Sequence, residues 1–172
     1  MADAPELPEA KDSFERAIAI SIAIMAVLLS FIDNKGDNAK TDSILKTNEA
    51  SNQWAYFQSK SIKQTIRELE ADVITLTPAA SSPDATKKLA EIKAEVERYD
   101  ADKAKISEDA KSLVATAAAS SAINDKCDQA ALLLQIAVVI ASVAILTRWK
   151  AMWYIGLALA AAGSYFGALA FF

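Results

Sequence analysis

The sequence contains no histidine and only one cysteine, Cys127. Zinc, haem and copper sites depend largely on histidine and cysteine ligands, so the usual ligand sets for these metals cannot form within one chain. A catalytic triad and a Cys–His pair are excluded for the same reason. We therefore predict no cofactor, no metal site and no catalytic residue, and we expect a protein that is not an enzyme.

Proline and glycine are also scarce, with four of each in the 172-residue chain. Neither occurs in residues 38–77 or 84–155, whereas Pro78 and Pro83 bound the short segment TPAASSP. A proline ring clashes with the preceding helical turn, so Pro78 should end one helix. A serine followed by Pro83 suits the start of the next. The sequence therefore predicts two long helices that form an antiparallel hairpin, with a turn near residues 77–83.

Charged residues are missing from three apolar runs, which cover residues 17–32, 129–147 and 151–172. A helix that crosses a bilayer needs about 20 mainly apolar residues. No small-residue cleavage site follows the first run, which favours an uncleaved anchor over a removed signal peptide. We therefore predict three transmembrane helices over these ranges. Coupled transporters usually carry a charged residue within a span, so a transporter is disfavoured.

The segment between the first two runs, residues 33–128, holds most of the charged residues and is mildly acidic. This balance makes nucleic acid an unsuitable partner. We predict that this segment forms the hairpin outside the bilayer, with an N-terminal tail over 1–16 and a cationic loop over 148–150. The predicted fold class is all-α: an integral membrane protein with three transmembrane helices and a long antiparallel coiled-coil helical hairpin outside the bilayer.

The short loop Arg148-Trp149-Lys150 predicts the orientation of the protein in its membrane. Short cationic loops remain in the cytoplasm, and tryptophan suits the interface beside them. We therefore expect a multi-pass protein of the bacterial inner (plasma) membrane with a cytoplasmic N-terminus. The hairpin is then expected in the periplasm.

Both arms of the hairpin contain a repeat with spacings of three and four, which is typical of a coiled-coil seam. In the second arm the seam comprises Leu89, Ile92, Val96, Tyr99, Lys103, Ile106, Ala110, Leu113, Ala117 and Ser120. In the first arm the predicted seam comprises Ile62, Ile66, Leu69, Val73 and Leu76, preceded by Ile44, Asn48, Ser51, Ala55 and Gln58. With a turn centred near residue 80 or 81, residue 54 should face roughly residue 107.

The first arm also contains an unusual concentration of aromatic and basic residues. Trp54 and Phe57 share one helix face, whereas Tyr56, Lys60 and Lys63 share another. One interpretation is packing inside the hairpin. A second is a self-association face, because buried tryptophan and tyrosine often anchor interfaces. A third is a site for another molecule, in which the two lysines would hold an anionic ligand.

Small residues form a stripe on the last apolar run, at Gly156, Gly163 and Gly167. Such spacing permits close contact between helices in lipid. The partner of this stripe is either another span of the same chain or a neighbouring chain.

The motif NQWAYFQSKSIKQ (residues 52–64), preceded by ERAIAISIAIMAVLLSFI (residues 15–32), resembles a bacterial family catalogued as domain of unknown function 4337. The resemblance covers most of the chain. It implies a small bacterial integral membrane protein with three spans. It implies no known activity and supplies no catalytic or binding residues.

We therefore predict a non-enzymatic, membrane-anchored structural or interaction protein, which either self-associates or is an accessory subunit of a larger membrane complex. The expected partners are membrane lipids and protein chains, and no small-molecule substrate is identified. Two alternatives remain: an oligomeric channel or pore, and a module that binds the cell envelope or lipid. The predicted interaction residues are Trp54, Tyr56, Phe57, Lys60, Lys63, Gly156, Gly163 and Gly167.

Overall fold

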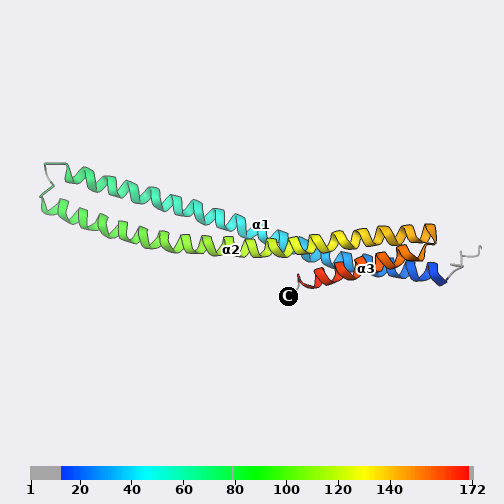
Figure 1. The fold of residues 1–172 in the computed structure, drawn as a ribbon. Coiled ribbons are helices and arrows are strands. Elements are labelled where there is room, and N and C mark those ends of the chain that lie inside the picture. Colours follow the sequence, from blue (N-terminus) through cyan, green and yellow to red (C-terminus); the bar gives the residue numbers. More distant parts are fainter. Residues whose placement is uncertain (1–12, 79, 171–172) are drawn as a thin grey trace, which may run out of the picture. The chain divides into compact units, whose positions relative to one another are not determined.

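The computed structural model describes residues 13–78 and 80–170, and over these residues the chain is all-α without a strand (Figure 1). Helix α1 covers Ser13–Thr75, α2 covers Pro83–Thr147 and α3 covers Lys150–Ala168. All three helices are long and apolar enough to cross a membrane. The predicted all-α fold is confirmed. Most of the predicted tail, Ala79 in the predicted turn and residues 171–172 lie outside the described residues.

The helix ends follow the local sequence chemistry. Ser82 caps α2, because its Oγ accepts a hydrogen bond of 3.2 Å from the backbone N–H of Ala85. Pro83 then occupies the first helical position, where its missing N–H has no helical partner to lose. Between α2 and α3, Arg148 adopts a left-handed backbone with φ of 54°, which lets the chain reverse within two residues.

The chain divides into two compact units. Unit 1 comprises residues 1–41 and 120–172, and unit 2 comprises Asp42–Ala119. Unit 2 is the central part of the segment that the sequence analysis assigns to the hairpin.

Small residues form the interior of unit 1. Ala130, Ala137, Ala141 and Ala144 of α2 have no exposed surface. The glycine stripe of α3 packs on this alanine face: a Cβ at Gly156 would lie 3.2 Å from the carbonyl oxygen of Ala137. Helices that lack bulky side chains approach closely and gain van der Waals contact, which is the main source of helix association in lipid.

The two other glycines of the stripe also contact the same chain. A Cβ at Gly163 would lie 3.1 Å from the carbonyl oxygen of Ala130, and one at Gly167 would lie 2.5 Å from Cδ1 of Ile32 on α1. The sequence left open whether the stripe meets its own chain or a neighbour. The structure places it against α2 and α1 of its own chain.

The first turns of α1 lie beside the turn between α2 and α3. Arg148 donates to Glu15 over 2.9 Å, and the rings of Phe14 and Trp153 meet edge to face at 5.6 Å. Ser21 accepts a 3.4 Å hydrogen bond from the indole N–H of Trp153. These contacts hold the start of α1 against the turn between α2 and α3.

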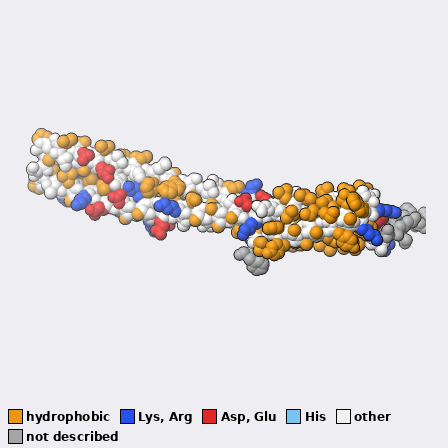
Figure 2. All heavy atoms as spheres, viewed as in Figure 1, with side chains coloured by type: hydrophobic (Ala, Val, Ile, Leu, Met, Phe, Trp, Pro, Cys, Tyr) orange, Lys and Arg blue, Asp and Glu red, His pale blue; other side chains and the backbone are white. Residues whose placement is uncertain are grey.

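The outer surface of unit 1 is strongly apolar (Figure 2). On α1 the exposed side chains include Ile20, Ile24, Val27 and Phe31. On α2 they include Leu132, Ile136 and Val139. Large aliphatic side chains therefore cover much of the outside, while alanine and glycine fill much of the interior beside Ile18, Met25, Ile32 and Leu134. A water-soluble bundle exposes fewer large aliphatic side chains than this.

In unit 2, α1 and α2 run antiparallel and are joined by specific polar contacts. Ser43 donates to the carbonyl oxygen of Ala117 over 2.9 Å, and Lys60 donates to Asp102 over 2.8 Å. The midpoint in sequence between the two partners is residue 80 for the first pair and residue 81 for the second. This register agrees with the one expected from the position of the turn.

The repeat predicted for the second arm faces α1. Ile92, Ile106, Ala110 and Ala117 are buried, and the remaining members in unit 2 are partly buried. The spacing of apolar residues in α2 therefore identified its inward face correctly.

The seam predicted for the first arm is wrong. Its apolar members Ile62, Ile66, Leu69 and Val73 are 57–63% exposed, and Leu76 is 85% exposed. The upstream members Ile44, Asn48, Ser51, Ala55 and Gln58 are exposed as well. The face of α1 that packs on α2 instead carries Ala50, Phe57, Lys60, Gln64, Arg67, Ala71 and Ile74.

The physical reason is that long basic side chains can lay their methylene stems along a neighbouring helix while their charged ends find partners. Lys60 reaches Asp102, and Arg67 reaches Glu95 on α2 over 2.7 Å. These cross-helix pairs fix a mixed polar and aromatic face against α2. The apolar face of α1 is consequently left on the outside of unit 2.

Candidate interaction site

The aromatic motif of the first arm lies at the centre of a charged cluster in unit 2. The Nζ of Lys60 lies 5.5 Å from the ring centroid of Tyr56 and 5.3 Å from that of Tyr99. The same nitrogen lies 2.8 Å from Oδ2 of Asp102. We call these four residues the Lys60 cluster. An ammonium group held between two aromatic faces and a carboxylate is stabilised by cation–π and ionic attraction together.

A second arrangement of the same kind lies beside the Lys60 cluster. The rings of Trp54 and Phe57 meet edge to face at 5.6 Å, a favoured geometry for aromatic pairs. The Nζ of Lys103 lies 6.0 Å from the centroid of Phe57 and 3.1 Å from Oδ1 of Asp100. Lys103, the one charged member of the seam predicted for the second arm, is therefore placed over an aromatic ring of the first arm.

These contacts change the acid–base properties of the groups involved. The hydrogen bond to Asp102 raises the pKa of Lys60, and the same bond lowers the pKa of Asp102. The pKa of Asp100 is lowered first by Lys103 and then by Gln64. Each shift favours the charged form, so the charged pairs stabilise the packed state of the two helices.

The predicted interaction residues of the motif differ in their exposure and in their partners. Lys60 is partly buried and occupied by Asp102, whereas Lys63 is exposed. Tyr56 is half exposed, and Trp54 and Phe57 are partly buried. The ammonium group of Lys60 is therefore already paired with a carboxylate, and Lys63 is the more accessible of the two lysines.

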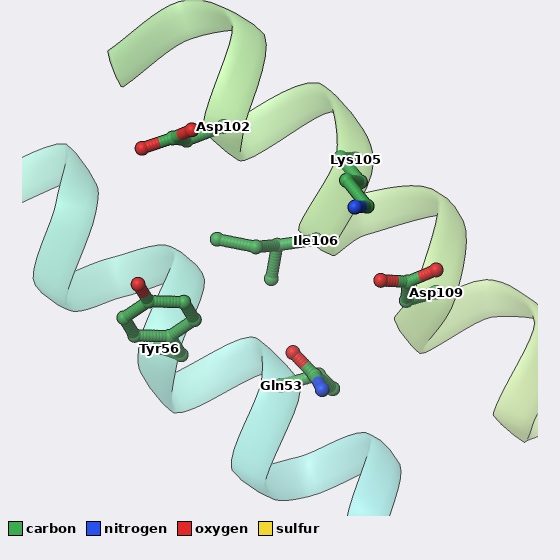
Figure 3. Close-up of a pocket in the computed structure, with 6 residues that line it drawn as sticks. All are labelled: Gln53, Tyr56, Asp102, Lys105, Ile106 and Asp109. Atoms are coloured by element: carbon green, nitrogen blue, oxygen red, sulfur yellow. The ribbon is translucent and has the colours of Figure 1, made fainter. Parts of the chain in front are cut away.

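A shallow groove of about 270 Å³ lies beside the cluster, between α1 and α2 (Figure 3). It is lined by Gln53, Tyr56, Asp102, Lys105, Ile106 and Asp109. The carboxylate of Asp102 is already paired with Lys60, so the remaining charges of Lys105 and Asp109 leave the groove without a net charge. A groove without net charge offers no specific attraction to an anionic headgroup or a polyanionic cell-wall strand.

Sequence reasoning missed two members of the cluster, Tyr99 and Asp102. Their spacing of three residues puts them on one face of α2. The register centred on residue 80 or 81 puts that face opposite Lys60. The spacing and the register together indicate the cluster, whereas the heptad repeat alone indicates only that Tyr99 faces the first arm.

One polar side chain in the interior of unit 2 is incompletely bonded. Gln64 is 9% exposed, and its Nε2 donates to Glu68 over 2.8 Å. Its Oε1 is buried and accepts no hydrogen bond within the described part of the chain. A buried amide oxygen without a donor costs free energy, so the inward face of α1 is not optimised for stability alone.

Within the residues that the structure describes, no three Asp, Glu or Cys side chains gather as a metal-ligand group. The fold and the cluster define an all-α protein with three long apolar helices and a charged helical pair. The chain belongs to the family described as Domain of unknown function (DUF4337), whose match covers residues 14–172. No curated protein and no solved structure matches the chain.

Proposed function

We propose that this protein is a non-enzymatic membrane anchor that holds a two-helix interaction module outside the bilayer. In this proposal, α1 and α2 each enter the membrane through their apolar parts in unit 1, and α3 crosses it. Unit 2 is the interaction module. The protein serves by self-association or as an accessory subunit of a larger membrane complex.

The observation that carries the proposal is the difference in charge between the two units, because the exposed aliphatic surface of unit 1 lies on runs without a charged residue, whereas unit 2 carries charge pairs between its helices. Unit 1 buries alanine and glycine and exposes Ile20, Ile24, Leu132 and Ile136. A surface of this kind is satisfied by lipid, because lipid tails remove the cost of exposing it to water. Unit 2 instead joins its helices by charge pairs such as Lys60–Asp102 and Arg67–Glu95, which suit an aqueous environment.

The contacts at one end of unit 1 support an orientation for the proposed anchor. Arg148, Lys150 and Trp153 gather with the start of α1, and this cationic and aromatic end suits the cytoplasmic interface. We propose the inner membrane of a bacterium as the location, with unit 2 on the periplasmic side.

Two measurements on intact cells and isolated membranes test this proposal. An integral protein resists extraction by alkaline carbonate, whereas release into the soluble fraction would contradict the anchor. Single cysteines at Asp84 and Trp149, placed in a Cys127→Ala background, report the orientation. We expect a membrane-impermeant maleimide to label position 84 in intact spheroplasts and position 149 only after permeabilisation. The reverse pattern would contradict the orientation but not the anchor.

A further inference from the structure

The outward face of α1 in unit 2 carries a continuous apolar stripe. Its members on α1 are Ile62, Ile66, Leu69 and Val73, and Leu76 continues their spacing one residue past the end of α1; we call these five residues the outer stripe. All five are more than half exposed. At about 100° per residue, Ile66 and Leu69 lie on the side of the helix opposite to Gln64 and Arg67, which face α2. Within the described residues, nothing in the chain covers this stripe.

An uncovered stripe of this length needs an explanation. Single exposed apolar residues are normal, but a contiguous row of large aliphatic side chains marks an interaction surface. The stripe is also separate from the internal packing of unit 2, which uses the other face of α1. Lipid is an unsuitable cover, because Glu70 and Asp72 flank the stripe and their charges would be costly to place in hydrocarbon.

We propose that the outer stripe binds the outer stripe of a second copy of this chain, in a parallel and in-register two-helix seam. The spacing of four, three, four and three is a heptad repeat, in which Ile66 and Val73 occupy a positions and Ile62, Leu69 and Leu76 occupy d positions. Branched residues at a with leucine at d favour parallel two-stranded association. A heptad seam is self-complementary, so a twofold axis satisfies both copies with one surface.

The flanking residues are compatible with this arrangement. Lys63 and Glu70 occupy e positions, and Thr65 and Asp72 occupy g positions. A parallel seam places each g residue beside the following e residue of the other copy. Thr65 then meets Glu70, and the e position that would follow Asp72 lies beyond the end of α1, so like charges are not opposed. In-chain pairing also holds Glu70, whose carboxylate lies 2.6 Å from Arg67.

The direction of the seam rests on the proposed function. Two copies inserted in one membrane with the same orientation have α1 leaving that membrane in the same direction. Their outer stripes therefore run parallel. Each of the five residues of the outer stripe then faces the same residue of the other copy. In an antiparallel pairing that matches a with d positions, only four of the five residues face another member of the stripe.

Disulfide cross-linking of native membranes tests the proposal. Single cysteines replace Ile62 or Val73 in the full-length Cys127→Ala chain, and Thr75→Cys at an exposed c position is the matched control. In a parallel in-register seam, each cysteine faces its own counterpart. We expect covalent dimers from I62C alone and from V73C alone, and none from T75C.

Other outcomes would overturn the proposal. An antiparallel seam would cross-link Ile62→Cys only with Val73→Cys when the two variants are co-expressed. If both variants remain monomers and the chain still resists carbonate extraction, pairing with a second copy is rejected. The proposed membrane anchor is unaffected by that result. Loss of carbonate resistance would reject the proposed function itself, so the two failures are distinguishable.

A charge substitution provides an independent test. Leu69→Glu places a carboxylate at a position that is already exposed in a single chain, so the helical content of that chain should be unchanged. In the dimer the same change buries two like charges at the centre of the seam. We expect L69E to shift the solubilised protein from dimer to monomer with unchanged circular dichroism. A dimer that persists in L69E would contradict the proposal.

Discussion

The Nζ of Lys60 lies 2.8 Å from Oδ2 of Asp102 and within 5.5 Å of the ring centroids of both Tyr56 and Tyr99. This relationship explains much of the aromatic motif in the first arm. The motif supplies the ring and the ammonium, and α2 supplies the second ring and the carboxylate. The aromatic residues thus contribute to holding α1 and α2 in register, and the apolar residues of α1 remain available on the opposite face.

The pH dependence of unit 2 should follow from this pair. The lowered pKa of Asp102 gives stability that is present above about 3.9, its unfolded value, and is lost as pH falls through the folded value. The raised pKa of Lys60 gives stability that is present below about 10.4 and is lost as pH rises through the folded value. We expect thermal melting monitored by circular dichroism to be flat between these limits.

The matched variants Lys60→Met and Lys63→Met separate this effect from general acid unfolding. Lys60→Met removes the partner of Asp102, so the melting temperature should fall at neutral pH and should vary less at both extremes. Lys63→Met changes an exposed side chain and should leave the profile as it is. Identical profiles for the two variants would show that the Lys60–Asp102 pair contributes nothing.

Gly163→Leu should destabilise unit 1. An added Cβ would lie 3.1 Å from the carbonyl oxygen of Ala130 and from Cγ of Leu134, so a larger side chain must push α3 away from α2. Overpacking of this kind costs about 1–3 kcal/mol. Ala161→Leu is the control, since Ala161 is exposed on the same helix, and its effect should stay within about 0.5 kcal/mol. Unfolding in mixed micelles measures both values, and equal stabilities would contradict the packing.

Gln64→Met should stabilise unit 2 by about 1 kcal/mol, because it removes a buried amide oxygen that lacks a donor. The thioether fills similar space and requires no partner. Gln58→Met, on the exposed side of the same helix, should be close to neutral. Chemical denaturation of both variants supplies the comparison. A destabilised Gln64→Met protein would mean that the amide is better satisfied than the geometry indicates.

Cys127 should react slowly with water-soluble maleimides. Its side chain is 1% exposed, and a Cβ at Gly36 of α1 would lie 3.0 Å from the Cβ of Cys127. Burial also raises the pKa of the thiol, which reduces the reactive thiolate. A cysteine at exposed Thr75, in the Cys127→Ala chain, should react much faster. If Cys127 of the wild-type protein reacted as fast as the cysteine at position 75 of the variant, the close packing of α1 against α2 at Cys127 would be contradicted.

The heptad spacing of apolar residues could be predicted from the sequence more readily than the face of each helix that packs inward. In α2 one row of residues is clearly the most apolar, and this row faces inward. In α1 two sets of residues carry a heptad spacing. One set is the apolar outer stripe, and the other combines Phe57, Lys60 and Arg67 with alanine, glutamine and isoleucine. Hydrophobicity favoured the apolar row, but the cross-helix partners of Lys60 and Arg67 on α2 determined that the other row faces inward.

The small-residue stripe shows a similar division. The sequence identified Gly156, Gly163 and Gly167 as a surface for close contact, because spacing and side-chain size are local properties. The partner of the stripe depends on how distant segments pack, which spacing does not encode. Only the structure places it on Ala137 and Ala130 of α2 and on Ile32 of α1.

The native mass of the protein, gently solubilised from its own membrane, tests the central claim most directly. We expect a homogeneous species of two copies of the 18.4 kDa chain for the wild type and a single copy for Leu69→Glu. A wild-type protein that is a stable monomer without any partner would contradict self-association through the outer stripe.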